Sequence, residues 1–454
     1  MSDTIAAIAT ARAPSAIGIL RLTGEDTAAI LDKVFRPKGQ PMSARSTRAM
    51  VLGDVLDRTG QVIDNGLAVL MRAPNSYTGE DCAEIHCHGS PLVLQEVLLA
   101  LFAAGARQAR GGEFTQRAFL NGRMDLIQAE SVADLIDAET AEAARNAAGQ
   151  LHGAISRGVE EIYDGLMDIT SRFYAVVDYP DEDIEDLQRE TMVETLDKAE
   201  KKLSSLLATF DRGQILKQGV PTVILGKPNA GKSSLLNALL GYDRAIVTDV
   251  AGTTRDTVEE KVRCGSILLR LCDTAGIRET EDTVERIGVQ RSRDAAQRAS
   301  LALLVLDASS PLTEEDEESI ALAQRAPQHL VVLNKSDLPC CVDKAALKER
   351  FGRLLEICAK SGEGVDALAD AIEALYPAGT ASVGEVLTNA RQADAVQRAL
   401  VAVTAAKQAL EMGMTGDAVL TDAEGALEAL GELSGKSIRE DLVATIFSRF
   451  CVGK

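Results

Sequence analysis

Short apolar runs separated by turn-forming residues dominate the first 118 residues of the chain. Residues 16–22 and 66–71 have the length and composition of strands, whereas residues 91–106 follow the pattern of a helix. This alternation predicts a compact α/β domain over residues 1–118.

The pattern becomes helical from about residue 119. Residues 126–158 are rich in Ala, Glu and Asp. Their apolar positions recur at helical spacing, at Ala129, Val132, Leu135 and Ile136. Residues 187–207 continue in the same way, with Thr191 as a candidate N-cap, and the pair Tyr179-Pro180 separates the two stretches.

A similar helical pattern returns over residues 388–447. Neither helical stretch can bury its apolar stripe alone, so we expect the two to pack on each other. The residues between them would then be inserted into one helical domain. This interpretation assigns 119–215 and 379–454 to the helical domain and 216–378 to the inserted domain.

The inserted region alternates apolar strands with helical segments. Four runs are short and apolar on both faces, at residues 220–225, 268–272, 301–306 and 330–333. Such runs are typical of a parallel sheet that is buried between helices.

The composition is that of a globular protein. Of the 454 residues, 46% are hydrophobic and 26% are charged. Neither a signal peptide nor an apolar run of transmembrane length is apparent, so we expect a cytoplasmic protein. The net charge of −20 argues against a broadly basic nucleic-acid binder but leaves a local basic patch open.

The eight cysteines show no spacing typical of a disulfide scaffold or a zinc site. The cluster His86-Cys87-His88 is a candidate metal site. In a strand, however, the two histidines share a face and Cys87 points away, which favours ordinary strand packing.

Residues 226–233 (GKPNAGKS) follow a predicted strand and open a helix beginning near Ser234, which is the context of a Walker A loop. Its glycines let backbone N–H groups turn toward phosphates at a helix N-terminus. We expect Lys232 to reach the β- and γ-phosphates and Ser233 to ligate Mg²⁺.

Three later motifs complete a guanine-nucleotide site. Residues 273–276 (DTAG) follow the strand 268–272 and place Asp273 beside the phosphates. Residues 334–337 (NKSD) offer Asp337, which can accept from N1–H and the exocyclic amine of guanine, a pair that adenine lacks. Residues 358–360 (CAK) occupy the third base-binding slot, which more often begins with Ser. Its backbone N–H usually contacts the base, so we expect this exchange to be harmless.

The chain lacks the glutamine with which Ras-like proteins orient the attacking water, so it must stabilise the transition state in another way. Ile277 follows Gly276 at the position where a glutamine would orient the attacking water, and an alkyl group cannot polarise water. Thr254, in the switch segment 252–256 (GTTRD), is the expected second Mg²⁺ ligand. Asn229 offers a neutral oxygen that suits a monovalent cation acting in place of an arginine finger.

The predicted GTP-binding set is Asn229, Ala230, Gly231, Lys232, Ser233, Ser234, Thr248, Asp249, Val250, Ala251, Gly252, Thr253, Thr254, Asp273, Thr274, Ala275, Gly276, Asn334, Lys335, Asp337, Cys358, Ala359 and Lys360.

These motifs, together with residues outside the G domain, resemble the bacterial and organellar tRNA-modification GTPase family MnmE, also called TrmE. The resemblance covers essentially the whole chain. Outside the GTP-binding motifs it rests on residues 75–81 (NSYTGED), 112–115 (GEFT), 117–126 (RAFLNGRMDL), 128–130 (QAE) and 450–454 (FCVGK). The RAFLN segment and the Cys-x-Gly-Lys segment are far more specific than any GTP-binding motif.

The resemblance implies a homodimer of three-domain subunits. Each has an α/β tetrahydrofolate-binding and dimerisation domain, then a helical domain with a Ras-like P-loop G domain inserted into it. With the flavoprotein MnmG, in a heterotetramer, the family adds an aminomethyl or carboxymethylaminomethyl group to C5 of the tRNA wobble uridine. A 5,10-methylene- or 5-formyl-tetrahydrofolate supplies the carbon, and K⁺ activates hydrolysis as the G domains dimerise.

Residue roles follow from the same resemblance. It places K⁺ at Asn229, Thr248, Val250 and Thr253. It makes Glu285 the catalytic glutamate, which orients water indirectly; on residues alone, Glu285 would be an exposed helix carboxylate. It assigns folate to Arg21, Glu84, Arg123 and Lys454, of which Arg21 and Glu84 would otherwise pass as surface charges.

This chain departs from the family pattern at two positions. Arg123 stands where Lys is frequent, and Gly111 where Pro is frequent. Arg and Lys can both face a folate carboxylate, but with different geometries. Cys451 would lie near the folate, as a catalytic or redox thiol or as a structural one.

Two other functions remain open from the sequence. One is a ribosome-assembly or regulatory GTPase without a part in tRNA modification, which would share the G motifs. The other is an N-terminal domain that acts as an independent folate-dependent aminomethyltransferase under a purely regulatory G domain. The first 120 residues and the Cys-x-Gly-Lys segment argue against the former.

Overall fold

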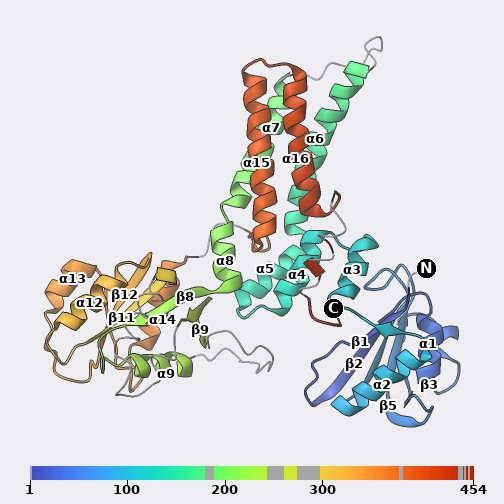
Figure 1. Ribbon diagram of the computed structural model, residues 1–454, viewed down its shortest axis with the longest axis horizontal. Helices are drawn as coiled ribbons and strands as arrows, with labels where there is room; N and C mark the ends of the chain where they lie inside the picture. Colours follow the sequence, from blue (N-terminus) through green and yellow to red (C-terminus); the bar gives the residue numbers. More distant parts are fainter. Residues whose placement is uncertain are drawn as a thin grey trace. The chain divides into compact units, whose positions relative to one another are not determined.

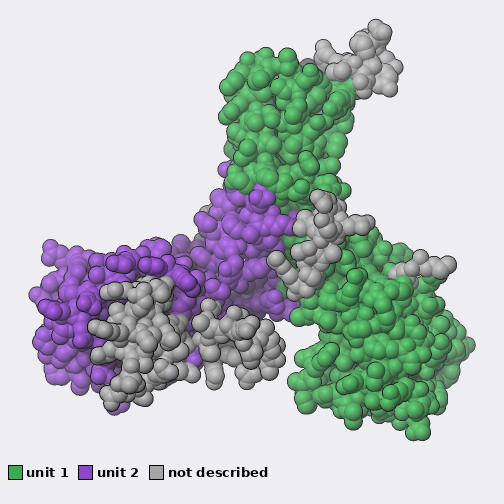
Figure 2. Space-filling model, viewed as in Figure 1, with its two compact units in different colours: residues 1–133, 150–203, 395–454 green, residues 134–149, 204–394 purple. Residues whose placement is uncertain are grey.

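A computed structural model describes residues 3–178, 189–242, 260–272, 297–377, 382–437, 443, 446–447 and 450–453. The chain forms two compact units (Figure 2). One contains residues 1–133, 150–203 and 395–454, and the other contains 134–149 and 204–394. The domain boundaries expected at residues 118, 215 and 378 stay predictions.

The first unit begins with a seven-stranded sheet in the order β3-β4-β5-β6-β2-β1-β7. Its neighbouring strands are antiparallel except β1 and β7. The strands are β1 (Ile5–Ile8), β2 (Ser15–Thr23), β3 (Phe35–Pro37), β4 (Val51–Leu56), β5 (Val62–Met71), β6 (Cys82–Gly89) and β7 (Arg107–Gln108). The two strands expected from the sequence correspond to β2 and β5.

Two helices, α1 (Thr27–Val34) and α2 (Pro91–Ala104), lie against this sheet (Figure 1). The short 3₁₀ helix Met42–Ala44 contacts α1. Buried apolar side chains from α1, α2 and the strands form one core, which includes Leu20, Ile85 and Leu101. The sheet's other face is therefore left for Arg21 and Glu84, which alternate with these buried residues.

The helical elements match the expected pattern in type, but the 126–158 stretch is divided between helices. The helices are α3 (Glu113–Leu120), α4 (Leu126–Ile136), α5 (Ala141–Leu151), α6 (Ala154–Asp178), α7 (Arg189–Leu207), α8 (Phe210–Gln218), α15 (Ala390–Glu411) and α16 (Gly416–Ser434). Thr191 lies inside α7, where its carbonyl accepts from Thr195, so its expected role as an N-cap is wrong.

Four long helices, α6, α7, α15 and α16, run side by side in Figure 1. Thr404 and Lys407 of α15 bond to Glu200 of α7, and Arg398 of α15 pairs with Glu432 of α16. Helices α6 and α16 are also in contact. The stretches before and after the inserted domain therefore pack on each other, as expected from their apolar stripes.

The second unit contains a six-stranded sheet in the order β13-β12-β11-β8-β10-β9. The strands are β8 (Val220–Leu225), β9 (Glu260–Cys264), β10 (Ile267–Leu271), β11 (Leu301–Asp307), β12 (Gln328–Asn334) and β13 (Leu354–Glu356). Besides α8 and most of α5, the described helices of this unit are α9 (Lys232–Tyr242), α12 (Glu314–Ala323), α13 (Lys344–Phe351) and α14 (Val365–Leu375).

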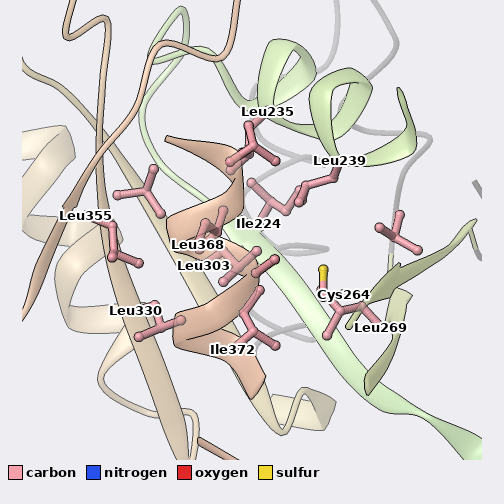
Figure 3. Close-up of a cluster of buried hydrophobic side chains, with 14 of the residues drawn as sticks. Ile224, Leu235, Leu239, Cys264, Leu269, Leu303, Leu330, Leu355, Leu368 and Ile372 are labelled. Carbon is pink, nitrogen blue, oxygen red and sulfur yellow. The ribbon is translucent and has the colours of Figure 1, made fainter. Parts of the chain in front are cut away.

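The four buried strands expected from the sequence are present and parallel. An edge strand, β9, was not expected and is antiparallel to β10. Figure 3 shows Leu235 and Leu239 of α9 and Leu368 and Ile372 of α14 in one apolar cluster with strand side chains. This packing fixes α9, and hence the loop before it, on the sheet.

The inserted part leaves and rejoins the helical elements at one place. The guanidinium of Arg212, in α8, donates to the carbonyls of Tyr376 and Pro377 at 2.7 and 2.6 Å. Thr209 Oγ1 accepts from the amide of Leu387 at 3.0 Å.

Among the described helices, none is long and apolar enough to cross a bilayer.

Candidate functional site

The loop between β8 and α9 has the backbone conformation of a phosphate cradle. Gly226 and Gly231 have φ of 149° and 98°, and Asn229 has φ of 60°. Glycine takes these values without the Cβ clash that other residues meet, and Asn tolerates the left-handed region. A Cβ on Gly226 would lie 2.3 Å from the Val305 carbonyl, so the loop also packs directly on β11.

Lys232 is the first residue of α9, two positions before the expected helix start. Its ammonium donates to the carbonyls of Gly226 and Lys227 at 2.7 and 2.8 Å. Burial lowers the pKa of this lysine. An anion bound at the start of α9 would favour the charged form of Lys232 and so oppose this effect of burial.

Asn334 joins two of the expected nucleotide loops. Its Nδ2 donates to the Ala230 carbonyl at 2.9 Å, and its Oδ1 accepts from the Ala359 amide at 3.0 Å. Asn334 is itself buried, at the end of β12. The side chain therefore holds the P-loop and the 358–360 loop in register at the carboxyl ends of parallel strands, where open α/β sheets bind ligands.

The neighbouring Lys335 has a partner that sequence reasoning missed. Its Nζ lies 2.6 Å from Oδ2 of Asp307, which ends β11. Burial disfavours the charged carboxylate, but the hydrogen bonds from Lys335 and Ser309 outweigh burial and lower the pKa of Asp307. Asp307 therefore holds the Lys335 ammonium. The sequence did contain a signal for this contact. Asp307 is a single acidic residue at the end of the apolar strand β11, and β11 pairs with β12, which ends in Asn334.

A second ion pair lies under the P-loop. Lys227 Nζ is 2.7 Å from Asp316 Oδ2, and the Asp316 side chain is 1% exposed. The same oxygen accepts from the amide and hydroxyl of Thr313, both at 2.8 Å, which forms the capping box of α12. No local sequence pattern links residues 227 and 316.

Asp337, the expected guanine-recognition residue, is exposed. Its Oδ1 lies 3.3 Å from the thiol sulfur of Cys358, which is buried. The expectation that only the backbone of the 358–360 loop matters thus missed a side-chain contact. Lys360 is exposed at the end of that loop.

The structure therefore brings together the P-loop residues and the two base-binding loops. Thirteen expected site residues lie outside the described residues: Thr248, Asp249, Val250, Ala251, Gly252, Thr253, Thr254, Asp273, Thr274, Ala275, Gly276, Glu285 and Lys454. Their roles, including three of the four K⁺ ligands, stay predictions.

The residues present fit a magnesium nucleotide. The Lys232 ammonium, the exposed hydroxyls of Ser233 and Ser234, and amides at the start of α9 are donors for phosphate oxygens. A Cβ on Gly231 would lie 2.0 Å from Asn334 Nδ2, so the cradle depends on glycine. Of the proposed Mg²⁺ ligands, the structure describes Ser233.

A second cluster surrounds Arg21 on the face of the N-terminal sheet opposite the core that contains Leu20 and Ile85. Arg21 and Glu84 are cross-strand partners on β2 and β6, and two guanidinium nitrogens lie 2.9 and 3.0 Å from Glu84 Oε1. The guanidinium carbon also lies over the rings of Tyr77 and Phe114, at 5.3 and 5.8 Å. The two expected charges therefore form one site.

The electrostatics of this cluster favour a fixed charge pair. Burial opposes the charged form of Glu84, but the positive charge of Arg21 outweighs it and lowers the pKa of the carboxyl. Glu84 Oε2 also contacts His86 Nε2 at 3.2 Å. Tyr77 and Phe114 were missed by sequence reasoning, although both lie in motifs of the resemblance, NSYTGED and GEFT.

The segment that contains Cys451 lies against the N-terminal part of the chain. Gly111 pairs with Val452 in an antiparallel bridge, and the Gly112 amide donates to the Cys451 carbonyl at 3.2 Å. A Cβ on Gly453 would lie 2.6 Å from the carbonyl of Ile8. Ile8 pairs with Leu20, next to Arg21 in β2. The Cys451 thiol is exposed.

The Arg123 side chain lies beside Gly79, in the loop that also contains Tyr77, but among the described residues it makes no contact with Arg21. Its side-chain Cγ lies 3.2 Å from where a Cβ on Gly79 would be. Arg21 and Glu84 therefore form an ion pair. That Arg123 binds folate together with them stays a prediction.

The residues of the candidate metal cluster have separate partners. His86 contacts Glu84, and His88 Nδ1 lies 2.8 Å from Asp64 Oδ1. Cys87 is buried on the opposite face of β6. Across the described ranges, no group of three or more His, Cys, Asp or Glu side chains could hold a metal ion.

An ion-pair network supports the edge that receives Val452. Glu113 is 3% exposed and pairs with Arg107, Arg110 and Arg117. Arg117 also pairs with Asp3 and Glu80, at 2.8 and 2.9 Å. Because Glu113 directly follows Gly111 and Gly112, the network fixes the backbone to which the Cys451 segment bonds.

Comparisons with known proteins cover both units. Residues 4–123 match the family described as "GTP-binding protein TrmE N-terminus", and residues 126–451 match "MnmE helical domain". The tRNA modification GTPase MnmE of Clostridioides difficile is 42% identical over 459 residues, which cover 100% of both chains. That of Roseiflexus sp. is 44% identical over 468 residues, covering 100% of this chain and 99% of its own.

Among solved structures, a variant of Era from Aquifex aeolicus is 26% identical, with a TM-score of 0.26. It covers 43% of this chain and 68% of its own, a likeness too slight to carry an argument. The two family matches and the full-length relatives agree with the fold, in which a P-loop domain is inserted into a helical domain behind an N-terminal domain. This chain belongs to the MnmE (TrmE) family of tRNA modification GTPases.

Proposed function

We propose that this protein hydrolyses GTP and, with the flavoprotein MnmG, adds an aminomethyl or carboxymethylaminomethyl group to C5 of the tRNA wobble uridine. A one-carbon tetrahydrofolate bound near Arg21 and Glu84 supplies the carbon. K⁺ at Asn229 assists hydrolysis as G domains of a homodimer meet. The protein acts in the cytoplasm.

The observation that carries the GTPase part is the double hydrogen bond of Asn334, which joins the P-loop to the 358–360 loop. A nucleotide bound there would have its phosphates at Lys232 and its base at Asp337. Mg²⁺ would be held by Ser233 and Thr254 and would neutralise charge on the phosphates. The alternative of a ribosome-assembly GTPase leaves the match of residues 4–123 unexplained.

Support for a folate site comes from the chemistry around Arg21. The Arg21 guanidinium pairs with a carboxylate and lies over the half-buried ring of Tyr77, so it offers a charged donor beside an aromatic face, while the buried ring of Phe114 supports it from the core. A pterin ring has hydrogen-bonding edges and π faces, so this combination suits it.

Cation dependence tests the hydrolysis mechanism. We expect GTP turnover in KCl to exceed turnover in NaCl several-fold, and Asn229→Ala to remove the difference while nucleotide still binds. Asn237→Ala, on the exposed side of α9, is the matched control and should keep the stimulation. Equal rates in the two salts would contradict a catalytic K⁺.

Glu285 is tested by alanine substitution. Glu285→Ala should abolish turnover without weakening GTP binding, whereas Glu281→Ala, a nearby carboxylate, should leave turnover unchanged. If Glu285→Ala retains full turnover, the assignment of that residue fails.

The modification itself is read from tRNA. Mass spectrometry of wobble uridines in a strain lacking this protein should show unmodified C5, restored by the wild type and not by Arg21→Gln. Calorimetry of the full chain with 5-formyltetrahydrofolate should show binding that Arg21→Gln abolishes and Arg58→Gln preserves. Absent binding by the wild type would remove the folate role.

A further inference from the structure

The loop that begins with Cys358 is held rigidly by its own backbone. The Cys358 amide donates to the Glu363 carbonyl at 2.9 Å, and its carbonyl accepts from the amides of Ser361 and Gly362. The next amide, that of Ala359, bonds to Asn334. Cys358 as a whole is 3% exposed, so its side chain has little freedom to rotate.

The Asp337 carboxylate is exposed and lies beside this thiol. Oδ1 is 3.3 Å from Cys358 Sγ, a normal donor–acceptor distance for sulfur. Within the described residues, the carboxylate has no other hydrogen bond or ion pair. Without the thiol, an exposed aspartate would sample several rotamers.

We propose that Cys358 is a positioning residue for base recognition, because its thiol fixes the Asp337 carboxylate in the orientation that guanine requires. The inference deepens the proposed function, since it rests on the placement of guanine at Asp337. A guanine needs both N1–H and its exocyclic amine accepted in one plane. The hydrogen bond from the thiol to one carboxylate oxygen fixes the plane of the carboxylate before the nucleotide binds. The Asp337 side chain therefore loses less conformational entropy on binding.

The nature of the donor makes the idea testable. A thiol is a weak donor, so its removal should cost a modest factor in affinity. The effect should depend on the base, because inosine lacks the amine and uses only one of the two contacts. A loss of stability would instead weaken every nucleotide alike.

The experiment measures dissociation constants of GDP and IDP with the full-length protein. We expect Cys358→Ala to weaken GDP binding about three- to tenfold and IDP binding clearly less. Cys358→Ser keeps a hydrogen-bond donor, so the ratio of its dissociation constants for GDP and IDP should stay within about twofold of the wild-type ratio. Cys264→Ala, a buried cysteine of the same domain's core, is the control and should not change the ratio.

A double-mutant cycle separates this inference from the proposed guanine site. Asp337→Ala should bring the affinities for GDP and IDP close to each other. In that background, Cys358→Ala should have no further effect on either affinity. If Cys358→Ala weakens GDP and IDP equally, or acts as strongly without Asp337, the thiol has no positioning role. If Asp337→Ala leaves the ratio unchanged, the placement of guanine itself is wrong, and the inference fails with it.

Discussion

Lys227 Nζ lies 2.7 Å from Asp316 Oδ2, and this ion pair ties the P-loop to the first turn of α12. The backbone carbonyl of the same lysine accepts from Lys232, the expected phosphate-binding residue. One P-loop residue therefore fixes the cradle through its side chain and the phosphate lysine through its main chain.

Loss of this pair should destabilise the protein. Asp316→Ala leaves the mostly buried Lys227 ammonium, 13% exposed, without its carboxylate and removes the cap of α12, so we expect a loss of about 2 to 4 kcal/mol in the free energy of unfolding. The double variant Lys227→Met/Asp316→Leu buries no charge and should be clearly milder. Urea unfolding measures both. A double variant as damaged as Asp316→Ala would show that the charge pair is not the cause.

The cradle should not tolerate a side chain at Gly231. A Cβ there would lie 2.0 Å from Asn334 Nδ2, at a φ of 98°. Gly231→Ala should therefore break the bond between Asn334 and Ala230 and weaken GTP binding by more than about tenfold. Gly241→Ala is the control, because a Cβ there meets no described atom within 4 Å. Unchanged GTP affinity in Gly231→Ala would contradict the geometry.

Acid should remove the contribution of Glu113. Burial disfavours its charge, but the hydrogen bonds and charge of Arg107 outweigh burial and lower the pKa to about 2. Because the folded pKa is below the unfolded value of 4.5, the stabilisation is complete above about pH 4.5 and is lost as pH falls toward 2.

Glu113→Gln should therefore cost about 3 kcal/mol at pH 7, and its deficit should shrink as pH falls from 4.5 toward 2. Urea unfolding of the wild type and the variant across this range measures the difference. Glu161→Gln, an exposed partner of Lys202, should change stability little at any pH. A deficit that does not vary with pH would exclude the ion-pair explanation.

Cys451 contributes its backbone, not its thiol, to the contacts that the structure shows. Cys451→Ala should therefore change the free energy of unfolding by less than about 0.5 kcal/mol and leave GTP hydrolysis intact. We expect wobble-uridine modification to fall, because the exposed thiol lies in the segment next to the Arg21 cluster. Cys340→Ala, also exposed, is the control. Full modification by Cys451→Ala would contradict a catalytic or redox role for the thiol.

The sequence predicted those elements whose pattern is local and repetitive. Strands β8, β10, β11 and β12 are buried on both faces, so each shows as an unbroken apolar run. Strand β9 was missed because its sequence, EKVRC, alternates charges with apolar residues at a sheet edge. Thr191 was misplaced because Thr is favoured at caps and yet tolerated inside helices.

Site residues were predictable where a motif fixes their spacing, as in the P-loop. Partners that come from distant segments were not, because no local pattern joins Lys227 to Asp316, Lys335 to Asp307 or Arg21 to Phe114. The Cys358 contact was missed for another reason. The role usual for that slot uses a backbone amide, and the side chain's direction depends on how the loop packs.

The bridge between Gly111 and Val452 joins segments about 340 residues apart. During synthesis the N-terminal sheet can form early, since most of its strands pair with near neighbours in sequence. The edge beside Gly111 must stay unpaired until the inserted and helical parts have left the ribosome. The segment that contains Val452 thus reaches a sheet that can already have formed, and the Arg21 cluster acquires this neighbour later than its partners on β6.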